Sequence, residues 1–265
     1  MLDLFGKAIL DYQIGNNPED LITETSISET DEMSVAYLFR SFEKMPKIEQ
    51  KALELSKGKI LDVGCGAGSH SLYLQNEKGL NVTAIDISEN AIKACKLRGL
   101  KNAKVQDVMC LDSDMHQNDE EQNAMKKAVL YESNNKYDTI LLLMNGAGMC
   151  GRLKNLGKFL TQLKSLLNEN GQILLDSSDI IYMFDDDDSE GSEGGKWIPA
   201  DMDYYGELVF DIQYKGEKEV PFDWMYIDYN TLQNAARDTG FQCELILEGE
   251  HFDYLARLIK RNSNS

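Results

Sequence analysis

The sequence lacks the features that mark disulfide-stapled, zinc-binding, secreted or membrane-spanning proteins. Its five cysteines are scattered, odd in number and without a C-x-x-C pair, so they indicate neither a disulfide framework nor a zinc site. No run of about 18 apolar residues is present, which speaks against a transmembrane helix. The first residues show no basic region followed by an apolar stretch, so we expect no signal peptide. Together these absences predict a protein of the reducing cytoplasm.

Positive charge is also scarce. Lysine and arginine number 27 against 45 aspartates and glutamates, a net charge of −18. A protein that grips nucleic acid needs a basic face for the phosphates, and none stands out, so we expect neither a nucleic-acid nor a membrane partner. The acidic run at residues 185–190 lacks the spacing of a calcium loop, so we predict a solvated loop there and no metal site.

The most informative segment is a glycine-rich turn between a short apolar strand and a helix. The strand covers residues 59–61 and ends at Asp62, and the turn at 64–68 reads Gly-Cys-Gly-Ala-Gly. A strand that turns into a helix through glycines leaves backbone N–H groups unpaired, and these can hold a polar ligand at the helix N-terminus. The G-x-G-x-G spacing has Ser69 where the dinucleotide fingerprint has its third glycine.

Further strand ends follow along the chain. The strand at 81–85 ends at Asp86, 22 residues after Gly64 and close to the roughly 20 expected for an acid that binds ribose hydroxyls. Asp86 could instead cap the next helix, but Ser88 can do that alone, which favours the ribose role. A third strand, at 103–106, ends at Asp107.

The remaining pattern predicts a parallel sheet. Residues 137–144 form a nearly continuous apolar run, typical of a strand buried on both faces, and 171–178 form another strand. Between them, 153–168 has helical periodicity. Strands that alternate with helices imply a doubly wound sheet, which binds its ligands at the carboxyl ends of the strands.

The C-terminal part adds a helix at 229–239, closed by Gly240, and two strands at 241–247 and 254–260. With the glycine turn and the acidic strand ends, this order resembles the class I S-adenosylmethionine (SAM)-dependent methyltransferases. The resemblance covers about 58–176 and 228–261. It implies an α/β fold with a seven-stranded, doubly wound mixed sheet that has a terminal antiparallel strand.

The resemblance also implies SAM as the cofactor and a set of donor-binding positions. These positions are Asp62, Gly64, Cys65, Gly66, Gly68, Asp86, Ile87, Asp107, Val108, Met144, Asn145 and Arg40. Asp107 would contact the adenine amino group, and a simple turn role is the alternative. Arg40 would bind the methionine carboxylate or a substrate acid, and a surface arginine is the alternative.

We expect a single domain over 1–265, in four parts. A helical N-terminal cap at 1–57 would precede the SAM-binding core at 58–176. An insertion at 177–227 would form a β-hairpin near residues 208–227, and 228–265 would hold the last helix and strands. Within the cap we predict a helix over 28–42 and another between Pro46 and Gly58.

The two added segments are the candidates for the acceptor pocket. Tyr37, Tyr182 and Trp224 would line it, because aromatic side chains exclude water from the reaction; a small satellite core is the alternative. We assign no catalytic residue. Asn145 is the best polar candidate near the methyl group, and His70 is expected to be a partly exposed spectator.

These expectations favour a methyltransferase that acts on a small-molecule acceptor. One alternative is a protein acceptor, chosen by the acidic surface. Another is a SAM-binding protein that transfers an aminopropyl group or is inactive. The aminopropyl reaction is disfavoured because Asn145-Gly146 stands where its usual aspartate follows strand four.

Overall fold

The computed structural model describes residues 2–111, 136–184, 198 and 202–261. The acidic run at 185–190 and the loop that we predicted there lie outside these residues, as does nearly all of the polar stretch at 112–136.

The main sheet has seven strands in the order β11-β12-β7-β6-β3-β4-β5, which confirms the predicted sheet. Its strands are β3 (Lys59–Val63), β4 (Asn81–Asp86), β5 (Ala103–Val105), β6 (Tyr137–Leu142), β7 (Leu167–Ser178), β11 (Phe241–Glu248) and β12 (Asp253–Lys260). The first five run parallel, and β12 is antiparallel to both β7 and β11. This is the predicted terminal strand pair.

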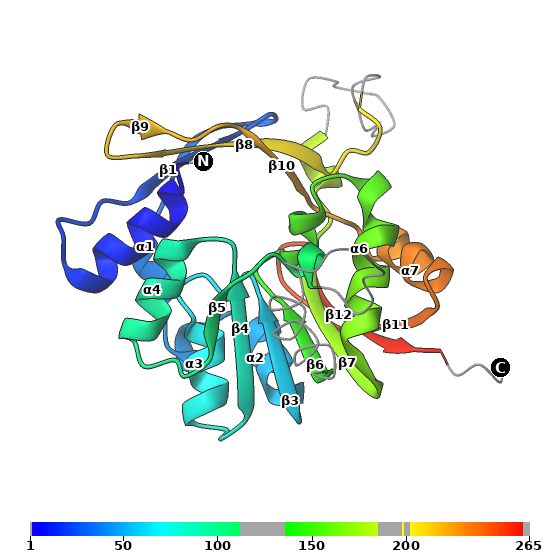
Figure 1. Ribbon diagram of the computed structural model, residues 1–265. Helices are drawn as coiled ribbons and strands as arrows, with labels where there is room; N and C mark the ends of the chain where they lie inside the picture. Colours follow the sequence, from blue (N-terminus) through cyan, green and yellow to red (C-terminus); the bar gives the residue numbers. More distant parts are fainter. Residues whose placement is uncertain (1, 112–135, 185–197, 199–201, 262–265) are drawn as a thin grey trace, which may run out of the picture.

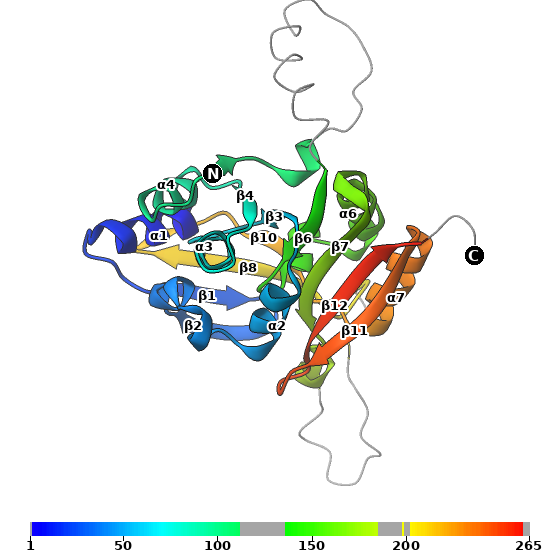
Figure 2. The same cartoon turned by 90° about the horizontal axis from the view of Figure 1, so that it is seen from below.

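Helices cover both faces of this sheet (Figures 1 and 2). They are α2 (Lys47–Leu55), α3 (Ser69–Asn76), α4 (Glu89–Leu97), α6 (Leu153–Leu166) and α7 (Tyr229–Asp238). The central strands alternate between two cores, with Leu61 packed in the core under α6 and α7 and Ile60 in the core under α2 and α3. Because both faces are buried, the strands read as continuous apolar runs.

A second sheet has the order β10-β8-β1-β2, with β9 paired to β8. Its strands are β1 (Leu21–Thr25), β2 (Ser28–Met33), β8 (Glu207–Tyr214), β9 (Glu217–Lys218) and β10 (Phe222–Met225). We call it the covering sheet. The hairpin predicted in the insertion is therefore present, but it pairs with the N-terminal segment through β8 and β1.

The prediction of a helix over 28–42 was wrong. Residues 28–33 form β2, and Val35–Phe39 form a 3₁₀ turn. β2 is the edge strand of the covering sheet, and its pairing with β1 overrides a composition that carries no β-strand signal of its own. The N-terminal segment does contain helix α1 (Leu4–Ile14) and, after Pro46, helix α2 as predicted.

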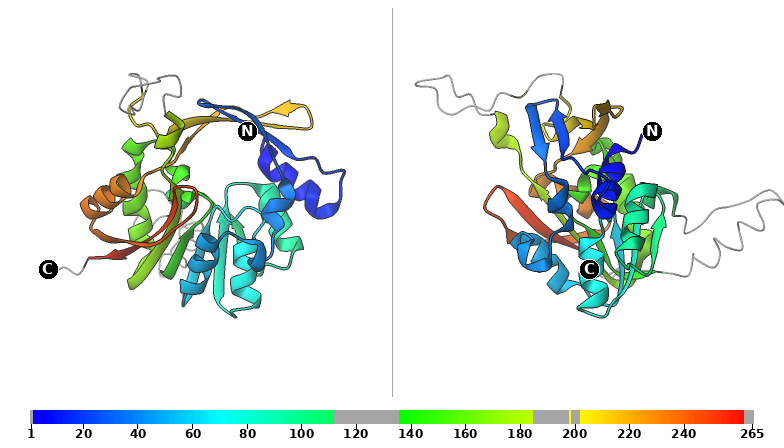
Figure 3. Two further views of the ribbon diagram at one scale, coloured as in Figure 1. Left: turned by 180° about the vertical axis from the view of Figure 1, so that it is seen from behind. Right: turned by 90° about the vertical axis from the view of Figure 1, so that its left-hand side faces the viewer.

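The covering sheet lies over the edge at which the parallel strands of the main sheet end (Figures 1 and 3). Two contacts fix it there. The indole of Trp224 lies so close to Gly148, in the turn after β6, that a Cβ at that glycine would come within 2.1 Å of it. At the other side, Ile9 of α1 packs with Ala67 of the glycine turn. Within the described ranges, no helix is long and apolar enough to cross a bilayer.

Candidate active site

The glycine turn joins β3 to α3 and is tied to β4. Gly64, Gly66 and Gly68 have φ angles of +70°, +51° and +79°, which other residues rarely adopt. The N–H groups of Gly64 and Cys65 donate to the Ile85 carbonyl at 2.9 and 3.1 Å. A Cβ at Gly66 would meet no atom closer than Ile9 Cδ1 at 4.0 Å. The turn is thus anchored to β4 by these two hydrogen bonds, and the space beside Gly66 is open.

Asp86 supports the open side of this turn. Its two carboxylate oxygens accept the N–H groups of Gly66 and Ser88, each at 2.9 Å. Burial raises its pKa, against the lowering effect of these two donors. Ser88 caps α4 by accepting the Ala91 N–H, as predicted. Each oxygen of Asp86 keeps a lone pair for a further donor, and the neighbouring Ile87 is 69% exposed.

The other predicted donor positions differ in exposure. Asp107 is exposed and accepts the Met109 N–H at 2.8 Å, so the turn role is realised, whereas Val108 is buried. Asp62 is 2% exposed and accepts the Ser71 hydroxyl at 2.6 Å, and burial raises its pKa. Cys65 is buried, with its Sγ 3.9 Å from that of Cys95.

The chain turns sharply after β6, at Met144 and Asn145. Both residues have left-handed backbone angles, with φ of +59° and +58°. The carboxylate of Asp176, at the end of β7, accepts both of their N–H groups at 3.0 and 2.6 Å. Burial raises the pKa of Asp176 to about 7, although the two N–H donors act to lower it. Asp176 therefore holds a strained turn at the mouth of the sheet.

Asn145 ties this turn to its surroundings. Its Oδ1 accepts the Ser177 hydroxyl at 2.6 Å, its Nδ2 donates to the Met225 carbonyl at 3.2 Å, and its own carbonyl accepts the Gly148 N–H. Both polar groups of Asn145 are thus already used within the protein, which favours a wall of the site over a group that reacts.

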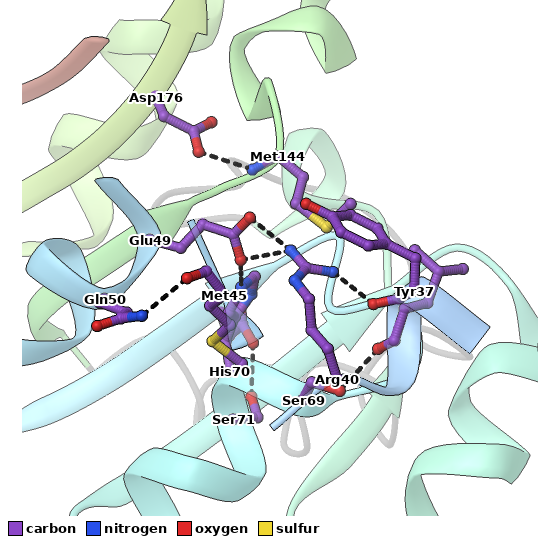
Figure 4. A network of polar contacts seen from close by, with 12 residues as sticks. Tyr37, Arg40, Met45, Glu49, Gln50, Ser69, His70, Ser71, Met144 and Asp176 are labelled. Carbon is purple, nitrogen blue, oxygen red and sulfur yellow. Dashed lines mark hydrogen bonds and ion pairs between the residues drawn. The ribbon is translucent and has the colours of Figure 1, made fainter. Parts of the chain in front are cut away.

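A buried ionic network lies beside this turn (Figure 4). Glu49 of α2 accepts hydrogen bonds from Arg40 Nη2 and from His70 Nε2, the latter at 2.6 Å. Arg40 Nη1 donates to the Tyr37 carbonyl at 2.7 Å, and its guanidinium lies 3.9 Å from the Tyr37 ring centroid. Burial alone would raise the pKa of Glu49, but the hydrogen bond and charge of His70 and the charge of Arg40 lower it below its usual value.

This network corrects two expectations. Arg40 is 7% exposed and paired with Glu49, so it is not a surface arginine; its Nε has no hydrogen-bond partner among the described residues, and its binding of a ligand carboxylate stays a prediction. His70 is 8% exposed and bound to the same carboxylate, not a partly exposed spectator. The physical reason is shared: an acid on the buried face of α2 supplies a counter-charge inside the protein.

A cavity of about 280 Å³ lies between this network and the covering sheet. Its lining residues are Tyr37, Ile48, Glu49, Met144, Asn145, Asp176, Ser177, Ser178, Tyr226 and Asp253. Of the three residues predicted for the acceptor, Tyr37 is in this lining. The other two are not, because Tyr182 stacks on Phe252 and Trp224 packs against Gly148. A larger cavity, of about 380 Å³, opens at the start of α6 and is lined by Arg152, Leu153, Lys154, Asp203 and Glu207.

Seven of the lining residues were not predicted from the sequence: Ile48, Glu49, Asp176, Ser177, Ser178, Tyr226 and Asp253. Asp176 had a usable signal, because it is an acid at the end of an apolar strand, as are Asp62 and Asp86. Glu49 had a weaker one, since it occupies a core position of an amphipathic helix beside Ile48. Tyr226 and Asp253 had none, because only the pairing of β12 with β7 and the hydrogen bond from the Ile227 N–H to Ser177 bring them here.

Comparison with known proteins agrees with this arrangement. A family model described as a methyltransferase domain matches residues 36–245. The solved structure of a SAM-dependent methyltransferase from Bacteroides fragilis, in complex with S-adenosyl-L-homocysteine, is 42% identical. It covers 98% of this chain and 95% of its own, with a TM-score of 0.81.

More distant matches are narrower. The ubiquinone biosynthesis O-methyltransferase of Idiomarina loihiensis is 38% identical over 53 residues, which are 20% of this chain and 21% of that protein. The chain thus matches about a fifth of the length of this curated relative. The CcbJ methyltransferase from Streptomyces caelestis shares the fold, with a TM-score of 0.55, 12% identity and coverage of 82% of this chain and 91% of its own. From the family model and the Bacteroides structure, the chain belongs to the family of SAM-dependent methyltransferases.

Proposed function

We propose that the protein transfers a methyl group from SAM to a small-molecule acceptor. The observation that carries this proposal is the 280 Å³ cavity directly beside the Met144–Asn145 turn, at the strand ends where doubly wound sheets bind ligands. Its volume is close to the lower end of the range of small-molecule sites, about 300–1,000 Å³. The likeness to a ubiquinone-pathway enzyme spans too little of either chain to favour a quinone acceptor.

The residues at the glycine turn fit the donor. Gly66 leaves open space beside its backbone, the adjacent Asp86 keeps lone pairs for the ribose hydroxyls, and Ile87 offers an exposed apolar surface for the adenine. Asp107 and Val108, at the end of β5, would border the adenine edge. When bound, SAM supplies a methyl group on a positively charged sulfur.

The protein's part in the reaction is to align two ligands and exclude water. The covering sheet and the Tyr37 segment enclose the cavity next to the donor site, and Asp176 fixes the turn between the two. Alignment of this kind is worth roughly 7–11 kcal/mol in well-oriented model reactions. All five cysteines are free, which supports the proposal of a cytoplasmic location.

The ribose role of Asp86 predicts a loss of donor affinity in Asp86→Ala. SAM should bind about 1–3 kcal/mol more weakly, because the ribose hydroxyls lose a charged acceptor. Isothermal titration calorimetry measures this directly. Asp238→Ala, which removes an exposed acid at the end of α7, is the matched control and should bind SAM normally. Equal affinities in the two variants would remove Asp86 from the donor site, and tight binding of NAD in place of SAM would refute the proposed function.

A further inference from the structure

The cavity lining is rich in acids and, among the described residues, contains no basic side chain. Three of its residues are carboxylates, Glu49, Asp176 and Asp253, and no lysine, arginine or histidine lines it. Two of these carboxylates already have strong partners: Glu49 binds Arg40 and His70, and Asp176 binds two backbone N–H groups.

Asp253 is the carboxylate without a cationic partner. It is half-buried at the start of β12, and its Oδ1 accepts the His251 N–H at 3.0 Å. Among the ion pairs of the described residues, none involves Asp253. Among the residues that the structure describes, none compensates the negative charge at this end of the cavity, which favours a ligand that brings a positive charge.

A row of aromatic rings leads from the cavity along the covering sheet. Tyr226 lines the cavity and is half-buried, and its ring centroid lies 6.4 Å from that of Phe210. Phe210 in turn stacks on Phe222 at 6.0 Å, its register partner on β10, so these two rings lie on one face of the sheet. Ring faces attract cations, and their area suits an apolar body.

We infer that the acceptor is an amine, bound as its ammonium form between Asp253 and the ring of Tyr226, with its apolar part along the Phe210–Phe222 row. This inference rests on the proposed function and names the substrate class of the same site. It also separates an amine from the hydroxyl acceptor of an O-methyltransferase, because a neutral hydroxyl would leave Asp253 without a counter-charge.

The chemistry of an amine acceptor balances with the groups present. The ammonium must first lose a proton, and Asp176, with its pKa of about 7, lies in the same lining and can take it near neutral pH. The nitrogen lone pair then forms the bond to the methyl carbon, and the electron pair of the broken carbon–sulfur bond stays on sulfur. The products are the methylated amine and S-adenosylhomocysteine.

The test compares three probes of similar size on the full chain saturated with S-adenosylhomocysteine, whose sulfur, unlike that of SAM, carries no positive charge. The probes are 2-phenylethylamine, 2-phenylethanol and phenylacetate. We expect the amine to bind about tenfold more tightly than the alcohol, a difference of about 1.4 kcal/mol, and phenylacetate to bind least. Equal binding, a preference for phenylacetate, or no binding of any probe would overturn the inference.

Single substitutions test which residue causes the preference for the amine over the alcohol. Asp253→Asn keeps an oxygen for the His251 N–H but removes the charge. The affinity for the amine should therefore fall to the affinity for the alcohol, with little change in melting temperature. Glu248→Gln removes an exposed charge on β11 and should keep the full preference. An amine preference that survives in Asp253→Asn would refute the role of Asp253.

Tyr226→Leu gives an independent readout, because it removes the ring and leaves every carboxylate in place; it should weaken the amine more than the alcohol. If S-adenosylhomocysteine itself does not bind, the proposed function fails, and the three probes are then compared without it. The two failures are thus told apart.

Discussion

The Glu49→Ala variant should lose about 3–5 kcal/mol of unfolding free energy, the usual result of removing one partner from a buried ion pair. Glu49 is 3% exposed and is the shared acceptor for Arg40 and His70. Without it, the guanidinium of Arg40 stays buried with only the Tyr37 carbonyl as a hydrogen-bond acceptor. Urea unfolding at neutral pH measures the loss.

The matched control is Glu54→Ala, in the same helix. Glu54 is exposed, and its carboxylate forms a solvent-exposed ion pair with Lys51 at 3.5 Å. The free energy of unfolding should therefore remain nearly unchanged. A loss in Glu49→Ala no larger than in Glu54→Ala would mean that the network is not stabilising.

The contribution of the Glu49–Arg40 pair to the free energy of unfolding should also depend on pH. The pKa of Glu49 in the folded protein is below its ordinary value of 4.5, so its contribution to stability is present above that value and is lost as the pH falls through the folded pKa. Glu49→Gln should therefore lose less stability than the wild type when the pH is lowered from 6 towards 3. Parallel acid-unfolding curves for the two proteins would contradict this.

Gly66→Val should reduce SAM affinity by at least about a hundredfold, equivalent to about 2.7 kcal/mol. A valine there would project into the open space beside Asp86, where nothing in the protein lies closer than 4.0 Å to a Cβ. The side chain would thus occupy volume that the donor needs. Calorimetry with SAM gives the affinity, and circular dichroism shows whether the variant folds.

A control for backbone strain is available in the same chain. Gly79 has a φ of +64°, close to the +51° of Gly66, and a Cβ there would also meet nothing within 4 Å. Gly79→Val imposes a similar strain in the loop before β4, away from the strand ends, and should bind SAM normally. If both variants lose affinity equally, strain and not occlusion is the cause.

The main sheet was predictable from the sequence because the residues of each strand themselves indicate that both faces are buried. Strands such as β6 are apolar on both faces, and the residue at which each strand ends is an acid or a turn. Only part of the covering sheet was predictable from the sequence. Its hairpin has β-branched and aromatic residues, but β2 has the pattern Ser-Glu-Thr-Asp-Glu-Met, with four exposed side chains in its middle. Only pairing with β1 makes it a strand.

The candidate site, too, was predictable from the sequence only in part. Donor positions such as Gly66 and Asp86 follow a fixed order along the chain, and a pattern of that kind can be recognised without a structure. The cavity has no such order, because its lining comes from the 3₁₀ turn near Tyr37, α2, the Met144–Asn145 turn, the end of β7, Tyr226 just after β10, and the start of β12. Arg40 shows the limit most clearly: its charge was noticed, but its partner Glu49 lies on another element.

The pairing of β1 with β8 also bears on how the chain folds. Ile22 lies opposite Gln213, so these strands cannot meet until most of the chain has been synthesised. The strands from β3 to β7, by contrast, pair over shorter separations, and contacts that are close in sequence form faster. A folding chain would thus pair the strands from β3 to β7 before it joins β1 to β8. In refolding experiments on a Trp197→Phe variant, which keeps Trp224 as its one tryptophan, recovery of SAM binding should precede recovery of tryptophan fluorescence.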